Sequence, residues 1–369
     1  MQDNKDIKRE EYVEVDKNMV IETQIGEPDI KFFDVRKPPF ELYGFYDPLG
    51  QPYFRRLPED VAEATSPGVA KLCREAAGGR VRFTTDSSYI AIKVEMGPYA
   101  RSAHTTLCNG AGFDLYEDTE TDSRFIKPFL PPYNFDRDYE QIIKLQGGRK
   151  KRSFTINFPV HGLVKRLYIG LQEDSVLEAG KKYRDAAPIV FYGSSIVHGT
   201  AASRPGLTYE GIVSRRLNMD YVNLGFSGQA KGEAVLVEYM AGLNMSLFVC
   251  DYDHNAPTVE FLRDTHRRVY DIFRAKQPET PYIMISRPNI ATNPVDFAER
   301  RDVVIDTYRY ARSLGDRNVY YIDGESFFLG KYENECTMDS VHPNDLGFTL
   351  MADGIESEIR RAMAKGGVL

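Results

Sequence analysis

Five short apolar runs, each separated from the next by a longer stretch of helical periodicity, occupy the second half of the 369-residue chain. The runs lie at residues 188–192, 221–226, 246–252, 281–286 and 319–323. Between and after them apolar residues recur three and four positions apart, as at 208–218, 232–242, 261–273, 297–313 and 345–363. Apolar strands that alternate with helices are typical of a parallel sheet covered on both faces. This half is therefore predicted to be a three-layer α/β/α domain.

The first half has a different pattern. Stretches at 80–85, 88–96, 152–158 and 165–171 alternate apolar and polar residues with a period of two. Such strands, separated by turn signals, predict an antiparallel β-sandwich of jelly-roll type. The charged segment 173–185 is interpreted as the connector. We therefore expect two domains, residues 1–180 with a polar leader and residues 181–369.

Composition narrows the partners and the compartment. The net charge of −7 disfavours nucleic acid and anionic membrane surfaces as partners, and no stretch of about 18 apolar residues predicts a membrane span. The start M-Q-D-N-K-D-I-K-R-E-E lacks the apolar region of a signal peptide. A cytoplasmic protein, or a periplasmic or secreted one whose leader has been removed, fits this start. The four isolated cysteines are expected in the core.

Polar residues follow the predicted strands where a parallel sheet places its active site, beyond the carboxyl ends. They are Ser194 and Ser195, Gly228, Asp253 to Asn255, Arg287, and, before the last helical segment, Asp339 and His342. Each has an ordinary structural explanation, such as a helix cap or a turn. His198 and His266 have no evident partner in the sequence and are interpreted as structural.

Taken together, these residues meet the needs of acyl transfer by a serine. Ser195 would be the nucleophile, His342 the base and Asp339 the acid that orients it. The backbone N–H groups of Ser195 and Gly228 and the side-chain amide of Asn255 would form the oxyanion hole. The α/β-hydrolase motif G-x-S-x-G is broken at Val197, which argues against that other serine-esterase fold.

Four blocks, G-S-S-I, N-L-G-F-S-G-Q, D-Y-D-H-N and D-S-V-H-P-N, resemble those of the SGNH (GDSL) hydrolases. Upstream, R-R-L-P (55–58) and G-F-D-L-Y (112–116), and A-S-R-P-G (202–206) after the nucleophile, are similar to the branch with an N-terminal GxDLY β-domain, which includes acetyl-xylan esterases. The resemblance implies a flavodoxin-like sheet and a serine carboxylesterase that needs no cofactor. It assigns the triad and the oxyanion hole to the same residues.

The departures from the family concern the mouth of the site. Ser194 stands where the family has an aspartate, and Asp253 and His254 stand where many relatives have glycines. Together with Arg204 and Arg287 they are candidate substrate-binding residues. A polar mouth suits a short acyl group, acetyl above all, on a carbohydrate or similar polar alcohol, in a small-molecule or an oligosaccharide ester. The β-domain is expected to lean over the strand ends or to build an interface in a homo-oligomer.

Two alternatives stay open. Asp251, Asp253, His254, Asp339 and His342 could hold a divalent metal in a metal-dependent hydrolase. Alternatively, the chain could be a non-catalytic carbohydrate-binding protein, with tyrosines of the β-domain stacking on sugars.

Overall fold

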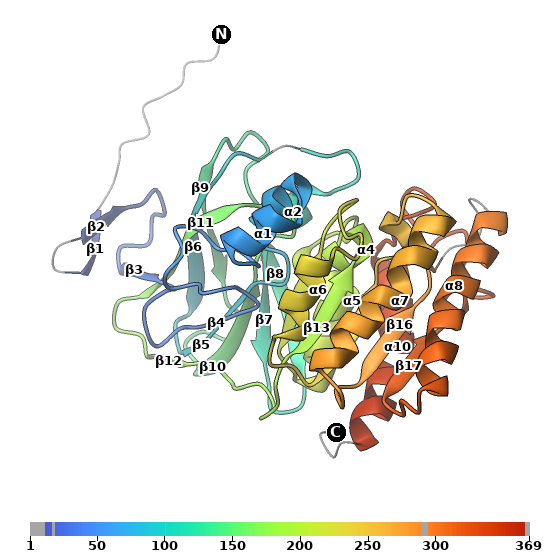
Figure 1. Ribbon diagram of the computed structural model, residues 1–369. Helices are drawn as coiled ribbons and strands as arrows, with labels where there is room; N and C mark the ends of the chain where they lie inside the picture. Colours follow the sequence, from blue (N-terminus) through green and yellow to red (C-terminus); the bar gives the residue numbers. More distant parts are fainter. Residues whose placement is uncertain (1–11, 17–18, 100, 289–293, 366–369) are drawn as a thin grey trace, which may run out of the picture.

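A β-sandwich and an α/β/α domain lie side by side in the protein (Figure 1). The computed structural model describes residues 12–16, 19–99, 101–288 and 294–365. The predicted fold class is confirmed, with antiparallel sheets in the N-terminal half and a parallel sheet in the C-terminal half. The predicted boundary between residues 180 and 181 falls between the last sandwich strand and the first parallel strand, and it stays a prediction.

The parallel sheet has five strands in the spatial order β14-β13-β15-β16-β17. They are β13 (Ile189–Gly193), β14 (Tyr221–Gly225), β15 (Leu247–Asp251), β16 (Tyr282–Ile285) and β17 (Val319–Ile322). In order of sequence this is 2-1-3-4-5, the flavodoxin-like arrangement, whose switch point lies beside β13. Residues of β13 alternate between two cores: Val190 and Tyr192 pack in one, Ile189 and Phe191 in the other.

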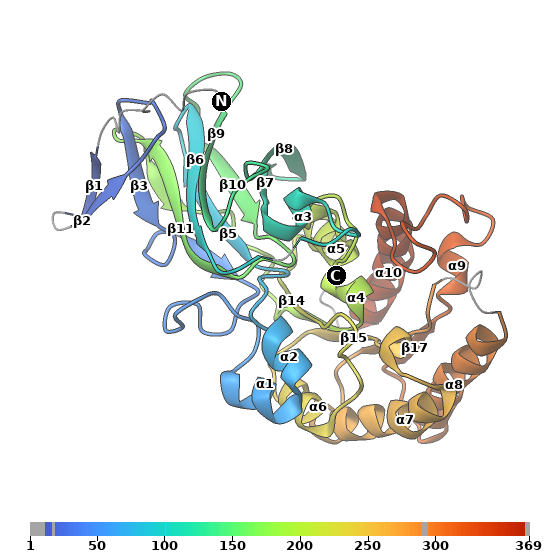
Figure 2. The ribbon, with the colours of Figure 1, turned by 90° about the horizontal axis from the view of Figure 1, so that it is seen from above.

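Helices cover both faces of this sheet (Figure 2). On one side lie α6 (Ala234–Ala241), α7 (Val259–Lys276) and α8 (Pro294–Ser313), and on the other α4 (Ser195–His198), α5 (Tyr209–Leu217) and α10 (Asp345–Lys365). Short elements complete the domain: η1 (Pro205–Leu207), η2 (Asp253–Asn255) and α9 (Glu325–Phe328). No helix among the described residues is both long enough and apolar enough to cross a membrane.

The N-terminal half packs two antiparallel sheets around one core. One sheet holds β12 (Leu177–Ala179), β5 (Arg80–Thr85), β10 (Arg152–Asn157), β7 (Phe113–Asp118) and β8 (Ser123–Phe129), with β4 (Glu41–Tyr43) paired to β5. The other holds β3 (Ile30–Asp34), β11 (Val164–Gln172), β6 (Tyr89–Met96) and β9 (Asp138–Lys144). A hairpin of β1 (Tyr12–Asp16) and β2 (Met19–Glu22) and three short helices, α1 (Glu59–Thr65), α2 (Pro67–Leu72) and α3 (Leu107–Ala111), are added to it.

The two halves share a core. Helix α1 contacts α6, and Figure 2 shows α1 and α2 beside it. Ala62 of α1 and Val69 of α2 belong to the same buried cluster as Leu236 and Met240 of α6. The N-terminal helices thus extend the layer that covers one face of the parallel sheet. The four cysteines are free and buried, as expected from the sequence.

Candidate active site

The end of β13 delivers Ser195 at the first position of α4. A Cβ at Gly193 would lie 2.1 Å from the carbonyl oxygen of Asp251, so only glycine lets β13 end this close to β15. Ser194 is fully buried, donates its N–H to that carbonyl (3.1 Å) and caps α4 by accepting the Ile196 N–H (3.2 Å). The short helix then begins at Ser195, whose N–H has no acceptor within the helix.

A continuous hydrogen-bonded chain joins Ser195, His342 and Asp339. The Ser195 Oγ lies 2.8 Å from His342 Nε2, and His342 Nδ1 lies 2.7 Å from Asp339 Oδ2. The other carboxylate oxygen accepts the N–H groups of Val341 (3.1 Å) and His342 (2.8 Å). Burial alone would raise the pKa of Asp339, but these hydrogen bonds lower it to about 2. The carboxylate is therefore charged and holds the imidazole with Nε2 toward the serine.

Gly228 and Asn255 follow the ends of β14 and β15, the two strands that neighbour β13 in the sheet. Gly228 has φ +70°, and a Cβ there would meet nothing within 4 Å, so glycine is required by the backbone conformation and not by lack of space. The Asn255 Nδ2 donates to the Phe226 carbonyl (2.8 Å), which leaves its second N–H bond for another acceptor. We propose these two residues and the Ser195 N–H as the oxyanion donors.

Asp253, Arg287 and Arg204, three of the other candidates, form ion pairs within the protein, whereas the buried Nε2 of His254 has no hydrogen-bond partner among the described residues. Asp253 is buried and accepts the Arg287 N–H (3.0 Å) and Nε (2.9 Å), and the same guanidinium reaches Asp296 (3.1 Å). Arg204 pairs with buried Asp114 (2.7 Å). Burial lowers the pKa of His254 to about 4, so its ring is neutral. Among these five candidates, Ser194 and Asp253 have almost no surface left with which to touch a substrate.

The metal-binding alternative finds no support in the side-chain arrangement. Among the described residues, the one group whose ligand atoms lie close enough to share an ion is Glu75, His161 and His198, which contains none of the residues proposed for that alternative. Both Asp253 oxygens are bound by Arg287, and Asp251 is fully buried.

Sequence reasoning missed His104, which comes from the N-terminal half. Its Nε2 lies 3.3 Å from Asp339 Oδ2, the same oxygen that binds His342. The adjoining segment is fixed to the C-terminal half, because Thr106 Oγ1 donates to the Ser203 carbonyl (2.6 Å) and Asn109 Nδ2 to the Gly199 carbonyl (3.2 Å). The β-domain therefore reaches the site, in agreement with the expectation that it leans over the strand ends. No spacing in the sequence relates His104 to Asp339.

Family models match both halves of the chain. Residues 186–360 match the GDSL-like lipase/acylhydrolase family, and residues 30–177 match GxDLY, the N-terminus of SGNH hydrolase-type esterases. The two matched regions together make up most of the chain and are those of a GDSL/SGNH-type esterase. A search of curated proteins found no match.

Solved structures of similar fold cover nearly the whole chain. A GDSL-like lipase from Bacteroides ovatus is 26% identical over 91% of this chain and 98% of its own, with a TM-score of 0.83. The salicylyl-acyltransferase SsfX3 of a tetracycline biosynthetic pathway is 21% identical over 93% and 99%, with a TM-score of 0.74. An acetyl xylan esterase from Butyrivibrio proteoclasticus is 11% identical over 91% and 99%, with a TM-score of 0.57. The last two likenesses concern the fold alone. The two family matches make this esterase an acyl ester hydrolase.

Proposed function

We propose that this esterase removes short acyl groups, acetyl in the first place, from a carbohydrate or similar polar alcohol through an acyl-enzyme on Ser195. The observation that carries the proposal is the hydrogen-bonded chain from Ser195 Oγ through His342 to Asp339, with spacings of 2.8 and 2.7 Å. Such a chain activates a serine hydroxyl, which is a weak nucleophile without an adjacent base.

In the proposed mechanism, His342 Nε2 takes the Ser195 proton as Oγ attacks the ester carbonyl. The negative charge that develops on the carbonyl oxygen is stabilised by the N–H groups of Ser195 and Gly228 and by the Asn255 amide. The intermediate collapses, the C–O bond breaks, and His342 returns the proton to the leaving alcohol. A water molecule, deprotonated by His342, then releases the acid and restores the serine.

The surroundings of the triad support a polar leaving group. The side chains of His342 and Asp339 are 21% and 23% exposed, so the nucleophile lies near solvent. On the N-terminal side, the Arg101 guanidinium donates to the carbonyl of Tyr133, whose side chain is 80% exposed. The exposed Tyr133 ring, beside the segment that carries His104, is suited to stacking on a sugar ring. Exposed tyrosines often bind in this way at interfaces that are apolar on one side and solvated on the other.

The test is a comparison of acyl esters with the wild type and Ser195→Ala. We expect hydrolysis of p-nitrophenyl acetate and release of acetate from an acetylated oligosaccharide, both abolished by Ser195→Ala and unaffected by a chelator. Activity that persists in Ser195→Ala and disappears with the chelator would overturn the serine mechanism. Faster hydrolysis of long-chain than of acetyl esters would overturn the substrate class.

A further inference from the structure

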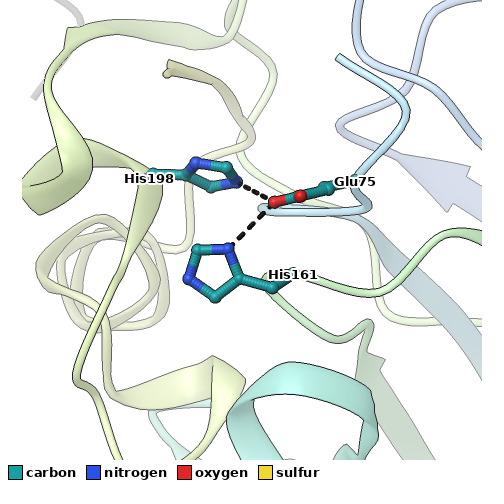
Figure 3. A group of neighbouring side chains, drawn as sticks. All are labelled: Glu75, His161 and His198. Carbon is teal, nitrogen blue, oxygen red and sulfur yellow. Dashed lines mark hydrogen bonds and ion pairs between the residues drawn. The ribbon is translucent and has the colours of Figure 1, made fainter. Parts of the chain in front are cut away.

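Glu75, His161 and His198 meet in a cluster that the catalytic chain does not use (Figure 3). One carboxylate oxygen of Glu75, Oε2, lies 2.9 Å from His161 Nδ1 and 3.1 Å from His198 Nε2. His198 is fully buried, and the side chains of the other two are each 18% exposed. His198, interpreted from the sequence as structural, thus has partners in the fold that the sequence did not reveal.

The cluster joins the two halves of the chain at α4, the short helix that begins with Ser195. Glu75 follows α2 and His161 follows β10, so both belong to the N-terminal half. His198 is the last residue of α4, three positions after Ser195. Arg56 adds a further tie from the N-terminal half, because its guanidinium donates to the carbonyls of Glu75 (2.9 Å) and Gly225 (2.7 Å) and lies over the ring of Phe226 (4.8 Å).

The far side of the cluster holds the loop that carries Gly228. His198 Nδ1 lies 3.0 Å from the Oγ of Ser227, the residue immediately before Gly228. Thr200 Oγ1 lies 3.3 Å from the same Ser227 oxygen and 3.1 Å from His161 Nε2. Ser227 is thus contacted along two routes, and both lead back to Glu75.

The charges in the cluster fix the direction of these hydrogen bonds. Burial opposes ionisation of Glu75, but the hydrogen bonds from His161 and His198 lower its pKa to about 2. Burial and the nearby Arg56 lower the pKa of His198 to about 3. A neutral His198 beside a carboxylate donates Nε2–H to it and keeps Nδ1 as an acceptor for the Ser227 hydroxyl. Glu75 thereby selects the tautomer that can hold Ser227.

Such a cluster could also bind a metal ion, because its three ligand atoms all lie within 4.8 Å of one another. The contacts favour hydrogen bonding instead. Each ring nitrogen that faces the cluster is already paired with Glu75 Oε2, and the Arg56 Nη2 lies 3.4 Å from His198 Nε2. A guanidinium this close to a ligand atom repels a divalent cation.

We propose that Glu75 is a positioning residue of the esterase: through His198 and Ser227 it holds the Gly228 N–H in the oxyanion hole. The proposal rests on the proposed function and extends it, because it makes the N-terminal domain part of the machinery that stabilises the transition state. A donor that is displaced slightly still lets substrate bind, but it binds the developing oxyanion less well.

The test is a double-mutant cycle with Glu75→Gln and Ser227→Ala, measured on p-nitrophenyl acetate. Each single variant should lower kcat about 10-fold, less than the loss of a whole oxyanion donor, with KM changed less than about twofold. The double variant should be no slower than the slower single variant, because both changes interrupt the same hydrogen-bond network between Glu75 and Ser227. Should Glu75→Gln fail to fold, Ser227→Ala still tests the route.

His266→Gln is the matched control. His266 is equally buried but stacks on Tyr252, outside the cluster, so its variant should lose stability and keep kcat. Unchanged kcat in both single variants, additive losses in the double variant, or a rise in KM alone would overturn the positioning role. So would stoichiometric zinc in the purified protein whose removal lowers kcat. A wild type that hydrolyses no acyl ester, or an active Ser195→Ala, overturns the proposed function itself.

Discussion

Asn255 uses one N–H bond of its side-chain amide within the protein, and in the proposed oxyanion hole it offers the other to the substrate. The bond to the Phe226 carbonyl (2.8 Å) fixes the orientation of the amide, so the second N–H needs no reorganisation when the oxyanion forms. We predict that Asn255→Ala lowers kcat by roughly 100- to 1,000-fold and leaves KM almost unchanged. Steady-state kinetics on p-nitrophenyl acetate measure this. A loss confined to KM would remove Asn255 from the oxyanion hole.

His104 is a second residue near the triad, and its contribution to kcat/KM can be measured separately from that of Asp339. It approaches Asp339 Oδ2 from the solvent side and is 48% exposed. Its removal takes one hydrogen-bond partner from the carboxylate that orients His342. We expect His104→Ala to lower kcat/KM about 3- to 10-fold, because a single hydrogen bond contributes about 0.5–1.5 kcal/mol net. Asp339→Asn, which supplies the wrong partner to His342, should cost roughly 1,000-fold or more. If His104→Ala and Asp339→Asn lowered kcat/KM by similar factors, the smaller role given to His104 would be wrong.

These residues mark what a sequence can predict about a site. Ser195, Asn255 and His342 could be proposed because a parallel sheet brings its strand ends together, whatever the lengths of the helices between them. His104, Glu75 and His161 could not, because they belong to loops of the other domain. Their positions depend on how the two domains pack, and no periodicity in the sequence encodes that packing.

At the scale of the elements, α5 carries a buried acid in its first turn. Burial raises the pKa of Glu210 to about 8, against 4.5 for an ordinary Glu side chain. The folded chain therefore keeps a proton that the unfolded chain releases above pH 4.5, and the free energy of unfolding falls as the pH rises from 4.5 to about 8. Glu210→Gln cannot ionise and should be more stable than the wild type at alkaline pH, by a margin that disappears in acid.

Urea unfolding at several pH values between about 5 and 9 measures this difference. Glu63→Gln, on the exposed side of α1, is the control and should follow the wild type. Asp251 is also buried, and burial raises its pKa. Part of the fall in the free energy of unfolding at alkaline pH should therefore remain in Glu210→Gln. If the free energies of unfolding of Glu210→Gln and the wild type changed in parallel with pH, Glu210 would already be ionised in the folded chain.

Elements with strong periodicity were predicted to within three residues at either end. The first apolar run, 188–192, became β13 (Ile189–Gly193), and the stripe at 345–363 became α10 (Asp345–Lys365). The first half was predicted as strands alone, and α1 and α2 went unnoticed. They span seven and six residues, too few turns to establish a periodicity, and tertiary contacts with α6 stabilise them.

At the scale of the whole molecule, the motifs of the N-terminal half serve to join the domains. Asp114, the aspartate of G-F-D-L-Y, is fully buried and accepts hydrogen bonds from Arg204 (2.7 Å) and the Gly206 N–H (2.9 Å) in the A-S-R-P-G segment. Arg56 of R-R-L-P reaches carbonyls at the end of β14. The sequence shows these blocks as separate resemblances, whereas the fold brings each against the catalytic domain.

This interface predicts that the two domains unfold together. Asp114→Asn leaves the largely buried Arg204 guanidinium, whose side chain is 16% exposed, without its counter-ion, and removal of one partner of a buried pair costs about 3–5 kcal/mol as an upper range. Glu117→Gln on the same strand is the matched control. It breaks an ion pair with the exposed Arg124 (2.8 Å), and such surface pairs contribute about 1 kcal/mol or less.

Calorimetry should show one transition for the wild type and for Glu117→Gln, and a transition at clearly lower temperature for Asp114→Asn. Esterase activity should decline along with that transition, because the domain that loosens also carries Glu75 and His104. Equal losses for the two variants would mean that the buried pair contributes no more than a surface pair. The apolar packing of α1 and α2 on α6 would then be what holds the domains together.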